Sequence, residues 1–208
     1  MEIIPAINAE SFEEVKRQIK LIEPYSEWAQ IDVCDGTFTQ NIIWHNPKDL
    51  ADIKTPLKLE AHLMINDIDQ KVEDWLIEPI SRIIFQLETA KDPFLVADKC
   101  RKAGKEVGIA IAPDTAWTRL VPFYEKVDIF QILSVRAGLA GQTFLEESLD
   151  KIIHIKENCP SAIIEVDGGI DKEAAKKAAE AGADILVTAS YIFSAKDIGM
   201  AVEELKNA

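Results

Sequence analysis

The sequence predicts an α/β protein built as a single (β/α)8 TIM barrel over residues 1–208, and three observations support this prediction. Eight short apolar runs alternate with segments of helical pattern. The repeat is about 26 residues long, which suits one strand and one helix. No linker, low-complexity tract or block of like charge divides the chain. A doubly wound open sheet is the competing α/β arrangement, and the count of eight units favours the barrel.

The strands are predicted from short runs of apolar and β-branched residues that end at turn residues. In the second run, Gln30 and Asp32 share one face and Ile31 lies on the other, as a strand requires. Strands are therefore predicted at 2–7, 28–33, 57–64, 82–88, 106–111, 128–133, 163–166 and 185–188.

The helices are predicted from capping residues and from apolar residues that recur every three or four positions. Ser11 and Glu14 form a capping box at the first helix, which Pro24 closes. Asp92 precedes a proline at the first position of a later helix, and Asp171 caps an alanine-rich one. Helices are predicted at 12–22, 69–75, 93–103, 116–124, 146–158, 172–181, 189–193 and 197–206.

The charge of the chain limits the classes of partner. There are 36 acidic residues against 23 Lys and Arg, a net charge of −13. This field repels nucleic acids and anionic membranes, so neither is an expected partner, and an anionic substrate needs local positive potential. Three cysteines without metal-like spacing, and no signal peptide or apolar span of membrane length, predict a cytoplasmic protein.

Polar side chains lie near the predicted strand ends, which meet at one mouth in a barrel. Asp32 and Asp167 each follow a buried run and precede turn residues. Asp32 is interpreted as a general base or as a hydrogen-bonded loop anchor, and His62 alone as a hydrogen-bonded core histidine. Acids in apolar surroundings are costly without partners, so the combined set favours a site. The side chains expected to face the mouth are those of Asn8, Gln30, Asp32, His62, Met64, Gln86, Leu133 and Asp167.

A phosphate site is predicted separately, from the last two loops. Gly168-Gly169 lies between the seventh strand and a helix, and Ala189-Ser190 lies between the eighth strand and a helical turn. Free N–H groups at these positions are the usual phosphate cradle of such barrels. Arg136, after the sixth strand, is expected to add a cation, and a solvated loop charge is the alternative.

Four stretches carry a family resemblance: residues 31–36 (Ile-Asp-Val-Cys-Asp-Gly), 62–65 (His-Leu-Met-Ile), 138–144 with its Gly-Gln-x-Phe ending, and 165–169 (Glu-Val-Asp-Gly-Gly). In this order and spacing the chain resembles the ribulose-phosphate 3-epimerase family along its whole length. The resemblance implies a barrel of the ribulose-phosphate-binding type. It also implies 1,1-proton transfer at C3 of a sugar phosphate such as ribulose 5-phosphate or xylulose 5-phosphate, in the pentose phosphate pathway.

The resemblance further implies roles for particular residues. Asp32 and Asp167 match the two family aspartates, of which one removes the C3 proton and the other donates to the opposite face. In the family, the same two aspartates and two histidines hold a divalent metal ion (Zn, Mn, Fe, Co or Mg), which stabilises the enediolate. His62 matches one of these histidines, and Gln30 stands in the place of the other. A homo-oligomer is implied as well. The residues expected to contact the substrate or its phosphate are Asn8, Met64, Arg136, Gly138, Gly141, Gly168, Gly169, Ala189 and Ser190.

Departures from the family pattern cluster at the mouth. Gln30 is a neutral and weaker ligand than histidine, so we expect weaker metal binding or a harder ion such as Mg²⁺ or Mn²⁺. Ala6 lacks the hydroxyl of a family serine, and Ala189 and His45 replace glycines. These changes leave open a catalytically altered or silent member that binds a phosphorylated metabolite or acts as an interaction scaffold. Another phosphate-binding barrel, such as a phosphoribosyl-anthranilate-type isomerase, is a third hypothesis; a decarboxylase of the orotidine-phosphate type needs lysine where Cys34 stands.

Overall fold

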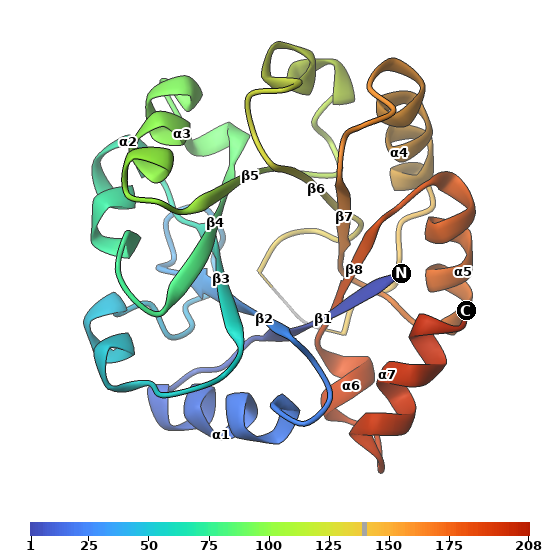
Figure 1. Cartoon of the computed structure of the whole chain (residues 1–208). Coiled ribbons are helices and arrows are strands. Elements are labelled where there is room, and N and C mark those ends of the chain that lie inside the picture. Colours follow the sequence, from blue (N-terminus) through green and yellow to red (C-terminus); the bar gives the residue numbers. More distant parts are fainter. Residues whose placement is uncertain (139–140) are drawn as a thin grey trace.

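The computed structural model describes residues 1–138 and 141–208, whose eight strands close into a parallel barrel (Figure 1). The strands are β1 (Glu2–Ile7), β2 (Trp28–Cys34), β3 (Lys58–Met64), β4 (Ile80–Gln86), β5 (Glu106–Ile111), β6 (Ile129–Leu133), β7 (Ile164–Asp167) and β8 (Ile185–Thr188). β1 pairs with both β2 and β8, which closes the ring and confirms the predicted fold class. Leu139 and Ala140, in the predicted loop after the sixth strand, lie outside the described residues.

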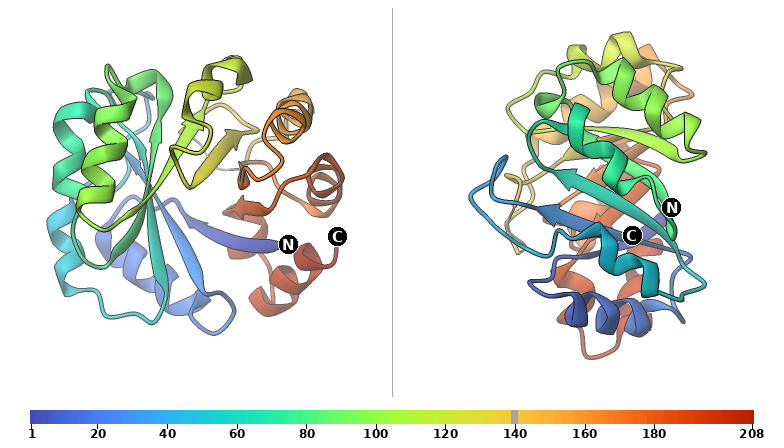
Figure 2. Two further views of the ribbon diagram at one scale, coloured as in Figure 1. Left: turned by 45° about the horizontal axis from the view of Figure 1, so that its top comes forward. Right: turned by 90° about the vertical axis from the view of Figure 1, so that its left-hand side faces the viewer.

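Helices cover the outside of the barrel (Figures 1 and 2). Predicted caps are present: Ser11, Asp92 and Asp171 each accept a hydrogen bond from the backbone N–H three residues later. None of the helices among the described residues has the length and apolar character needed to cross a membrane. The α-helices are α1 (Phe12–Ile22), α2 (Ile68–Lys71), α3 (Pro93–Lys102), α4 (Glu147–Asn158), α5 (Lys172–Ala181), α6 (Ser190–Phe193) and α7 (Ile198–Lys206), with 3₁₀ helices at Pro47–Asp52, Val72–Trp75, Leu87–Thr89 and Trp117–Phe123.

Three predicted elements differ in detail from the structure. The helix predicted at 69–75 is α-helical only over Ile68–Lys71 and continues as a 3₁₀ helix over Val72–Trp75. The strand predicted at 82–88 runs over Ile80–Gln86, because a 3₁₀ turn begins at Leu87. The Glu88 carboxylate instead accepts a hydrogen bond of 2.9 Å from the backbone N–H of Ala112, after β5. The short helix predicted at 116–124 is a 3₁₀ helix over Trp117–Phe123, because Pro122 inside it has no N–H with which to continue α-helical bonding.

The interior of the barrel contains a buried polar layer. Gln30, Glu60, Arg82, Gln131 and Glu165 are each at most 5% exposed. Each of the glutamine and glutamate side chains comes from a strand position that faces the barrel axis, whereas the alternate positions pack apolar side chains under the helices. This polar layer lies one step below the strand ends.

Arg82 is the cation of this layer. Its Nη1 lies 2.6 Å from Glu60 and its Nη2 lies 2.7 Å from Glu106. The guanidinium also stacks on the Trp28 ring, with 3.9 Å between Cζ and the ring centroid. Because Glu60 and Arg82 are almost fully buried, their pairing is needed to keep charge inside the barrel.

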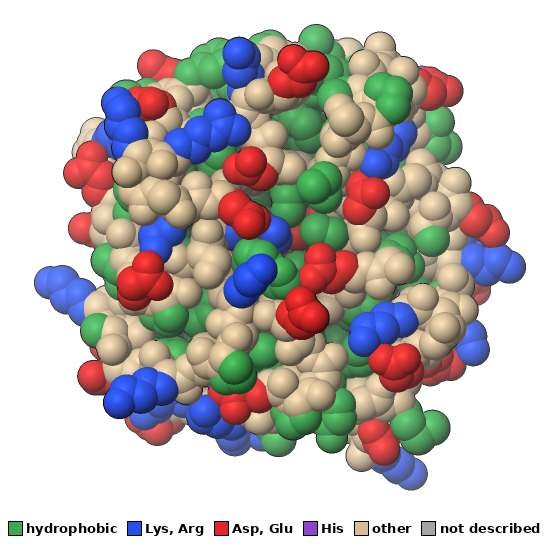
Figure 3. Space-filling view, in the orientation of Figure 1, with side chains coloured by type: hydrophobic (Ala, Val, Ile, Leu, Met, Phe, Trp, Pro, Cys, Tyr) green, Lys and Arg blue, Asp and Glu red, His purple; other side chains and the backbone are tan. Residues whose placement is uncertain are grey.

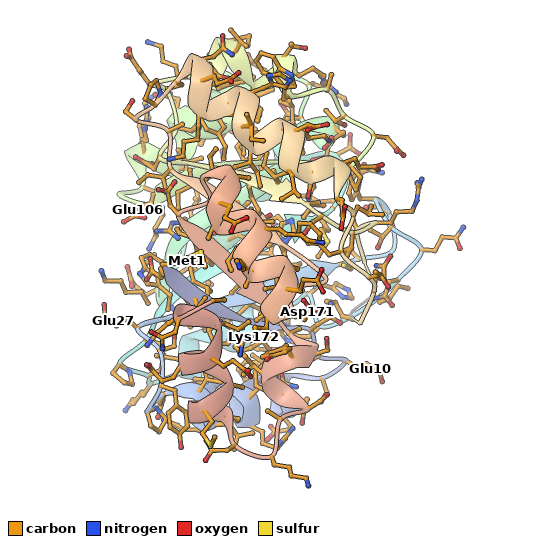
Figure 4. The ribbon with its side chains drawn as sticks, turned by 90° about the vertical axis from the view of Figure 1, so that its right-hand side faces the viewer. Met1, Glu10, Glu27, Glu106, Asp171 and Lys172 are labelled. Carbon is orange, nitrogen blue, oxygen red and sulfur yellow. The ribbon has the colours of Figure 1, made fainter. Side chains whose placement is uncertain are left out.

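The two ends of the barrel are distinct. Figure 4 shows Met1, Glu27 and Glu106, which stand at strand starts, at one end, whereas Glu10 and Asp171, which follow strand ends, lie toward the other. The face at which the strands begin carries interspersed acidic and basic side chains (Figure 3). The loops that follow the strands gather at the opposite end, which is where barrel enzymes place their sites.

Candidate active site

Three strands bring an acid, a histidine and a second acid together at the mouth of the barrel. Asp32 lies on β2 directly beside His62 of β3 in the parallel register, and Asp167 is the last residue of β7. Asp32 is 8% exposed and His62 is 1% exposed. Since all three face the axis from rigid strands, they have little freedom to separate.

The distances among these groups fit a divalent cation. His62 Nδ1 lies 3.4 Å from Asp32 Oδ1 and 3.3 Å from Asp167 Oδ2. One ligand atom from each residue lies within 4.8 Å of the others. The Gln86 amide lies 2.7 Å from His62 Nε2 and so keeps Nδ1 turned toward the acids. Two carboxylates and an imidazole are ligands that Mn²⁺, Fe²⁺, Co²⁺ and Zn²⁺ accept.

Gln30 places an amide NH₂ group at the centre of this cluster. Its Nε2 donates to Asp32 Oδ1 at 2.8 Å and to Asp167 Oδ2 at 2.9 Å. The same nitrogen lies 3.5 Å from His62 Nδ1. Asn8 supplies a further donor, with 3.2 Å from its Nδ2 to Asp32 Oδ2. The side chain predicted as a possible metal ligand therefore presents its nitrogen, not its carbonyl oxygen, to the acids.

The ionisation of the cluster reflects burial and mutual contact. Burial opposes protonation of His62, but the hydrogen bonds and negative charges of Asp167 and Asp32 outweigh it and raise the pKa of the imidazole to about 10. Burial also raises the pKa of Asp167 above its ordinary value; the His62 hydrogen bond opposes this rise and the charge of Asp32 adds to it. The cluster is thus suited to hold protons as well as a cation.

The polar layer below the cluster continues this hydrogen-bond network. Gln131 Nε2 donates to Gln30 Oε1 and to Glu165 Oε1, each at 2.7 Å. Glu165 in turn lies 3.9 Å from Arg82. Burial raises the pKa of Glu165 well above its ordinary value, and the nearby charge of Glu60 adds to the rise. The acid pair is therefore connected, through two amides, to the charged centre of the barrel.

A small cavity opens beside the acids and holds about 50 Å³, enough for a few water molecules. It adjoins an outer hollow of about 620 Å³, with which it shares Gly141, Gln142, Gly169 and Ser190. The predicted site residues that line the cavity are Asp32, His62, Asp167, Asn8, Met64, Gly138, Gly141, Gly168, Gly169, Ala189 and Ser190.

The loop after β7 requires glycine. Gly169 has a φ of +66°, and a Cβ atom there would lie 2.5 Å from the backbone nitrogen of Phe144. Gly168 has a φ of +110°, and its Cβ would lie 2.3 Å from the Val135 side chain. The loop after β6 thus packs directly against the predicted phosphate cradle, where only a residue without a side chain fits.

Arg136 lies apart from the other predicted site residues. Its side chain is 75% exposed and its Nη1 lies 3.1 Å from Asp114, whose side chain is 71% exposed. It borders a different hollow, with Phe38 and Asn41. His45 is also directed elsewhere, with its Nδ1 2.6 Å from the carbonyl oxygen of Ile43.

Gln131, Glu165 and Glu60 were not among the predicted site residues. A signal for them exists in the sequence, because each stands two positions before a residue that was expected to face the mouth: Leu133, Asp167 and His62. Alternation along a strand puts such pairs on the same face. The contacts of Gln131 with Gln30 and Glu165, in contrast, join strand residues more than 30 positions apart and depend on the closure of the barrel.

Solved structures with the same architecture define the fold class of the chain. The chain aligns over 100% of its length with 97% of a 3-hexulose-6-phosphate synthase from Salmonella typhimurium, at a TM-score of 0.73 and 17% identity. An orotidine 5'-phosphate decarboxylase from Pyrococcus horikoshii gives a TM-score of 0.68 at 15% identity, over 99% of this chain and 97% of that one. At these identities the likeness shows the fold alone, a TIM barrel.

Comparison of the sequence with known proteins identifies the family of the chain within this fold class. The model of the ribulose-phosphate 3 epimerase family matches residues 2–193, and the chain belongs to that family. A ribulose-phosphate 3-epimerase from Chlamydia pneumoniae is 36% identical over 87% of this chain and 82% of its own length. The chloroplastic ribulose-5-phosphate-3-epimerase of Arabidopsis thaliana is 31% identical over 98% of this chain and 75% of its own length.

Proposed function

We propose that this chain catalyses epimerisation at C3 of a phosphorylated ketose and interconverts ribulose 5-phosphate and xylulose 5-phosphate. The observation that carries the proposal is the convergence of Asp32 and Asp167, from β2 and β7, on a single amide nitrogen. Carboxylates that approach one point from two strands of a barrel can serve the two faces of one carbon atom. The names of the relatives point to epimerisation at carbon 3 of a ribulose phosphate.

The proton transfer uses the two acids in turn. The Asp32 carboxylate removes the C3 proton, and the electron pair of that C–H bond moves through C2 to the carbonyl oxygen. Protonated Asp167 then gives a proton to C3 on the opposite face, while the oxygen's electrons restore the carbonyl. The raised pKa of Asp167, caused first by burial, suits it to carry that proton. One proton leaves and one arrives, so the composition of the sugar does not change.

The negative charge that develops on the C2 oxygen needs stabilisation. Asp32, His62 and Asp167 would hold a divalent ion, and such an ion supplies Lewis-acid stabilisation of that oxygen when bound. Gln86 serves this site by fixing the His62 ring with Nδ1 toward the acids. Asn8 donates a hydrogen bond to Asp32 Oδ2 and so restricts the rotation of the Asp32 carboxylate.

The phosphate of the substrate is proposed to bind at Gly168, Gly169, Ala189 and Ser190. All four residues line the inner cavity, and Gly169 and Ser190 also line the outer hollow. This cradle relies on backbone N–H groups, which suits an otherwise acidic chain. The inner cavity of about 50 Å³ is smaller than a phosphorylated pentose. The substrate would therefore extend from the inner cavity into the adjoining outer hollow of about 620 Å³.

Turnover of ribulose 5-phosphate in a coupled assay, with Mn²⁺, Co²⁺, Zn²⁺ or Mg²⁺ supplied in turn, tests the proposal. Asp32→Asn and Asp167→Asn are each expected to lower kcat by about a thousandfold, because general acid–base groups contribute roughly 10² to 10⁴. Asp98→Asn is the matched control, since Asp98 is 52% exposed and pairs with Lys102 on α3. Wild-type rates in either active-site variant would exclude the two-aspartate mechanism.

A second candidate is a family member that binds a phosphorylated metabolite without turning it over. The position of the Gln30 NH₂ group between the acids favours it, because this group occupies the centre of the proposed metal site. In that case ribulose 5-phosphate raises the melting temperature of the protein. No turnover is then seen with any of the four ions.

A further inference from the structure

The orientation of the Gln30 side chain follows from its neighbours on two sides. Carboxylates accept hydrogen bonds, so Asp32 and Asp167 attract the NH₂ end of the amide. On the other side, Gln131 Nε2 lies 2.7 Å from Gln30 Oε1 and donates to it. Gln131 also donates to Glu165 at 2.7 Å, and it is completely buried on β6. Both sides therefore select the same orientation of Gln30.

A divalent ion at Asp32, His62 and Asp167 would favour the opposite orientation of the Gln30 amide on the side of the acids. On the side of Gln131 the preference stays the same. An amide nitrogen that carries two protons cannot coordinate a cation, so Gln30 has to present its carbonyl oxygen instead. That rotation directs Gln30 Nε2 toward Gln131 Nε2, and two donors then oppose each other. If Gln131 rotates as well, its donation to Glu165 is lost. The bond from Gln131 thus resists the change that the ion requires.

We propose that Gln131 is a positioning residue of the metal site, which sets the direction of the Gln30 amide and thereby weakens the binding of divalent ions. This inference rests on the metal site assigned under the proposed function. Gln131 itself lies below the acids and acts only through Gln30, because its polar contacts are with Gln30 and Glu165. Removing its amide releases Gln30 to turn its oxygen toward the ion.

The test is the affinity of the purified protein for Mn²⁺ alone, measured by calorimetry without any sugar. Gln131→Leu removes the donor and is expected to bind Mn²⁺ about fivefold more tightly than the wild type. This is roughly the effect of losing one buried hydrogen bond that opposes the rotation of Gln30. Gln131→Met, which keeps the length of the side chain, takes its place if the leucine variant does not fold. Gln18→Leu is the control, because Gln18 is a buried glutamine on α1, where it bonds to Glu14; its Mn²⁺ affinity is expected to equal that of the wild type.

A double-mutant cycle separates positioning from a general structural effect. In a Gln30→Ala background, Gln131→Leu is expected to leave the Mn²⁺ affinity unchanged, since no amide remains to be directed. An unchanged or weaker affinity in Gln131→Leu, or a gain that persists in the Gln30→Ala background, would overturn the inference. Because no substrate is present, these outcomes are independent of whether the protein epimerises ribulose 5-phosphate.

Discussion

Replacement of Arg82 by methionine is expected to destabilise the barrel strongly. Arg82 is 5% exposed and lies 2.6 Å from Glu60 and 3.9 Å from Glu165, both fully buried. Breaking a buried ion pair by removing one partner costs about 3–5 kcal/mol. At roughly 2–4 °C per kcal/mol for a chain of this size, the melting temperature should fall by about 6–20 °C. Thermal unfolding followed by circular dichroism measures this change.

The loss of stability caused by Arg82→Met should increase as the pH rises. Burial raises the pKa of Glu60 to about 7 even beside Arg82, and without the guanidinium its pKa rises further. Unfolded glutamate ionises near 4.5, and above about pH 7 only the wild type can ionise Glu60 while folded, so the variant's additional loss of stability is small at pH 5 and grows above pH 7. Arg101→Met is the control, because Arg101 is 46% exposed and lies 4.0 Å from Asp128. A fall below about 3 °C at pH 8, or an equal fall in the control, would refute the argument.

Three further predictions concern the site. Gln30→His replaces the NH₂ group with an imidazole ligand and should tighten Mn²⁺ binding by at least about tenfold in calorimetry; weaker binding would contradict the ligand set. Because the pKa of His62 is about 10, an ion must displace its proton, so Mn²⁺ affinity should rise about tenfold per pH unit between pH 6 and 8, and a flat profile would disagree. Gly169→Ala brings a Cβ to 2.5 Å from Phe144 and should raise KM for ribulose 5-phosphate by about fivefold or more, whereas Gly104→Ala, with a φ of +74° and open space, should lower stability alone.

The architecture and the meeting of the acids follow from local patterns in the sequence. Alternation along 28–33 puts Asp32 on an inward face, and the parallel strand ends then bring it to His62 and Asp167. These features depend on the alternation of residues along each strand and on the count of eight strand–helix units, both of which the sequence expresses directly.

Two features of the site depend on contacts that no local pattern expresses. The direction of the Gln30 amide is set partly by Gln131, which lies 101 residues away in the chain. Arg136 lies beside Asp114 of another loop in an exposed ion pair, and a loop side chain has no periodicity from which this position could be predicted. Single-sequence patterns give the face of a strand, but they do not give the polarity of a hydrogen-bond chain.

The fate of the hydrogen at C3 tests the central claim most directly. Ribulose 5-phosphate incubated with the wild-type protein in D₂O, and followed by proton NMR, should form xylulose 5-phosphate with deuterium at C3. Asp167→Asn should abolish this incorporation while the protein remains folded. Two results would contradict proton transfer by the two aspartates. One is xylulose 5-phosphate that retains the original C3 hydrogen, and the other is formation of deuterated xylulose 5-phosphate by Asp167→Asn.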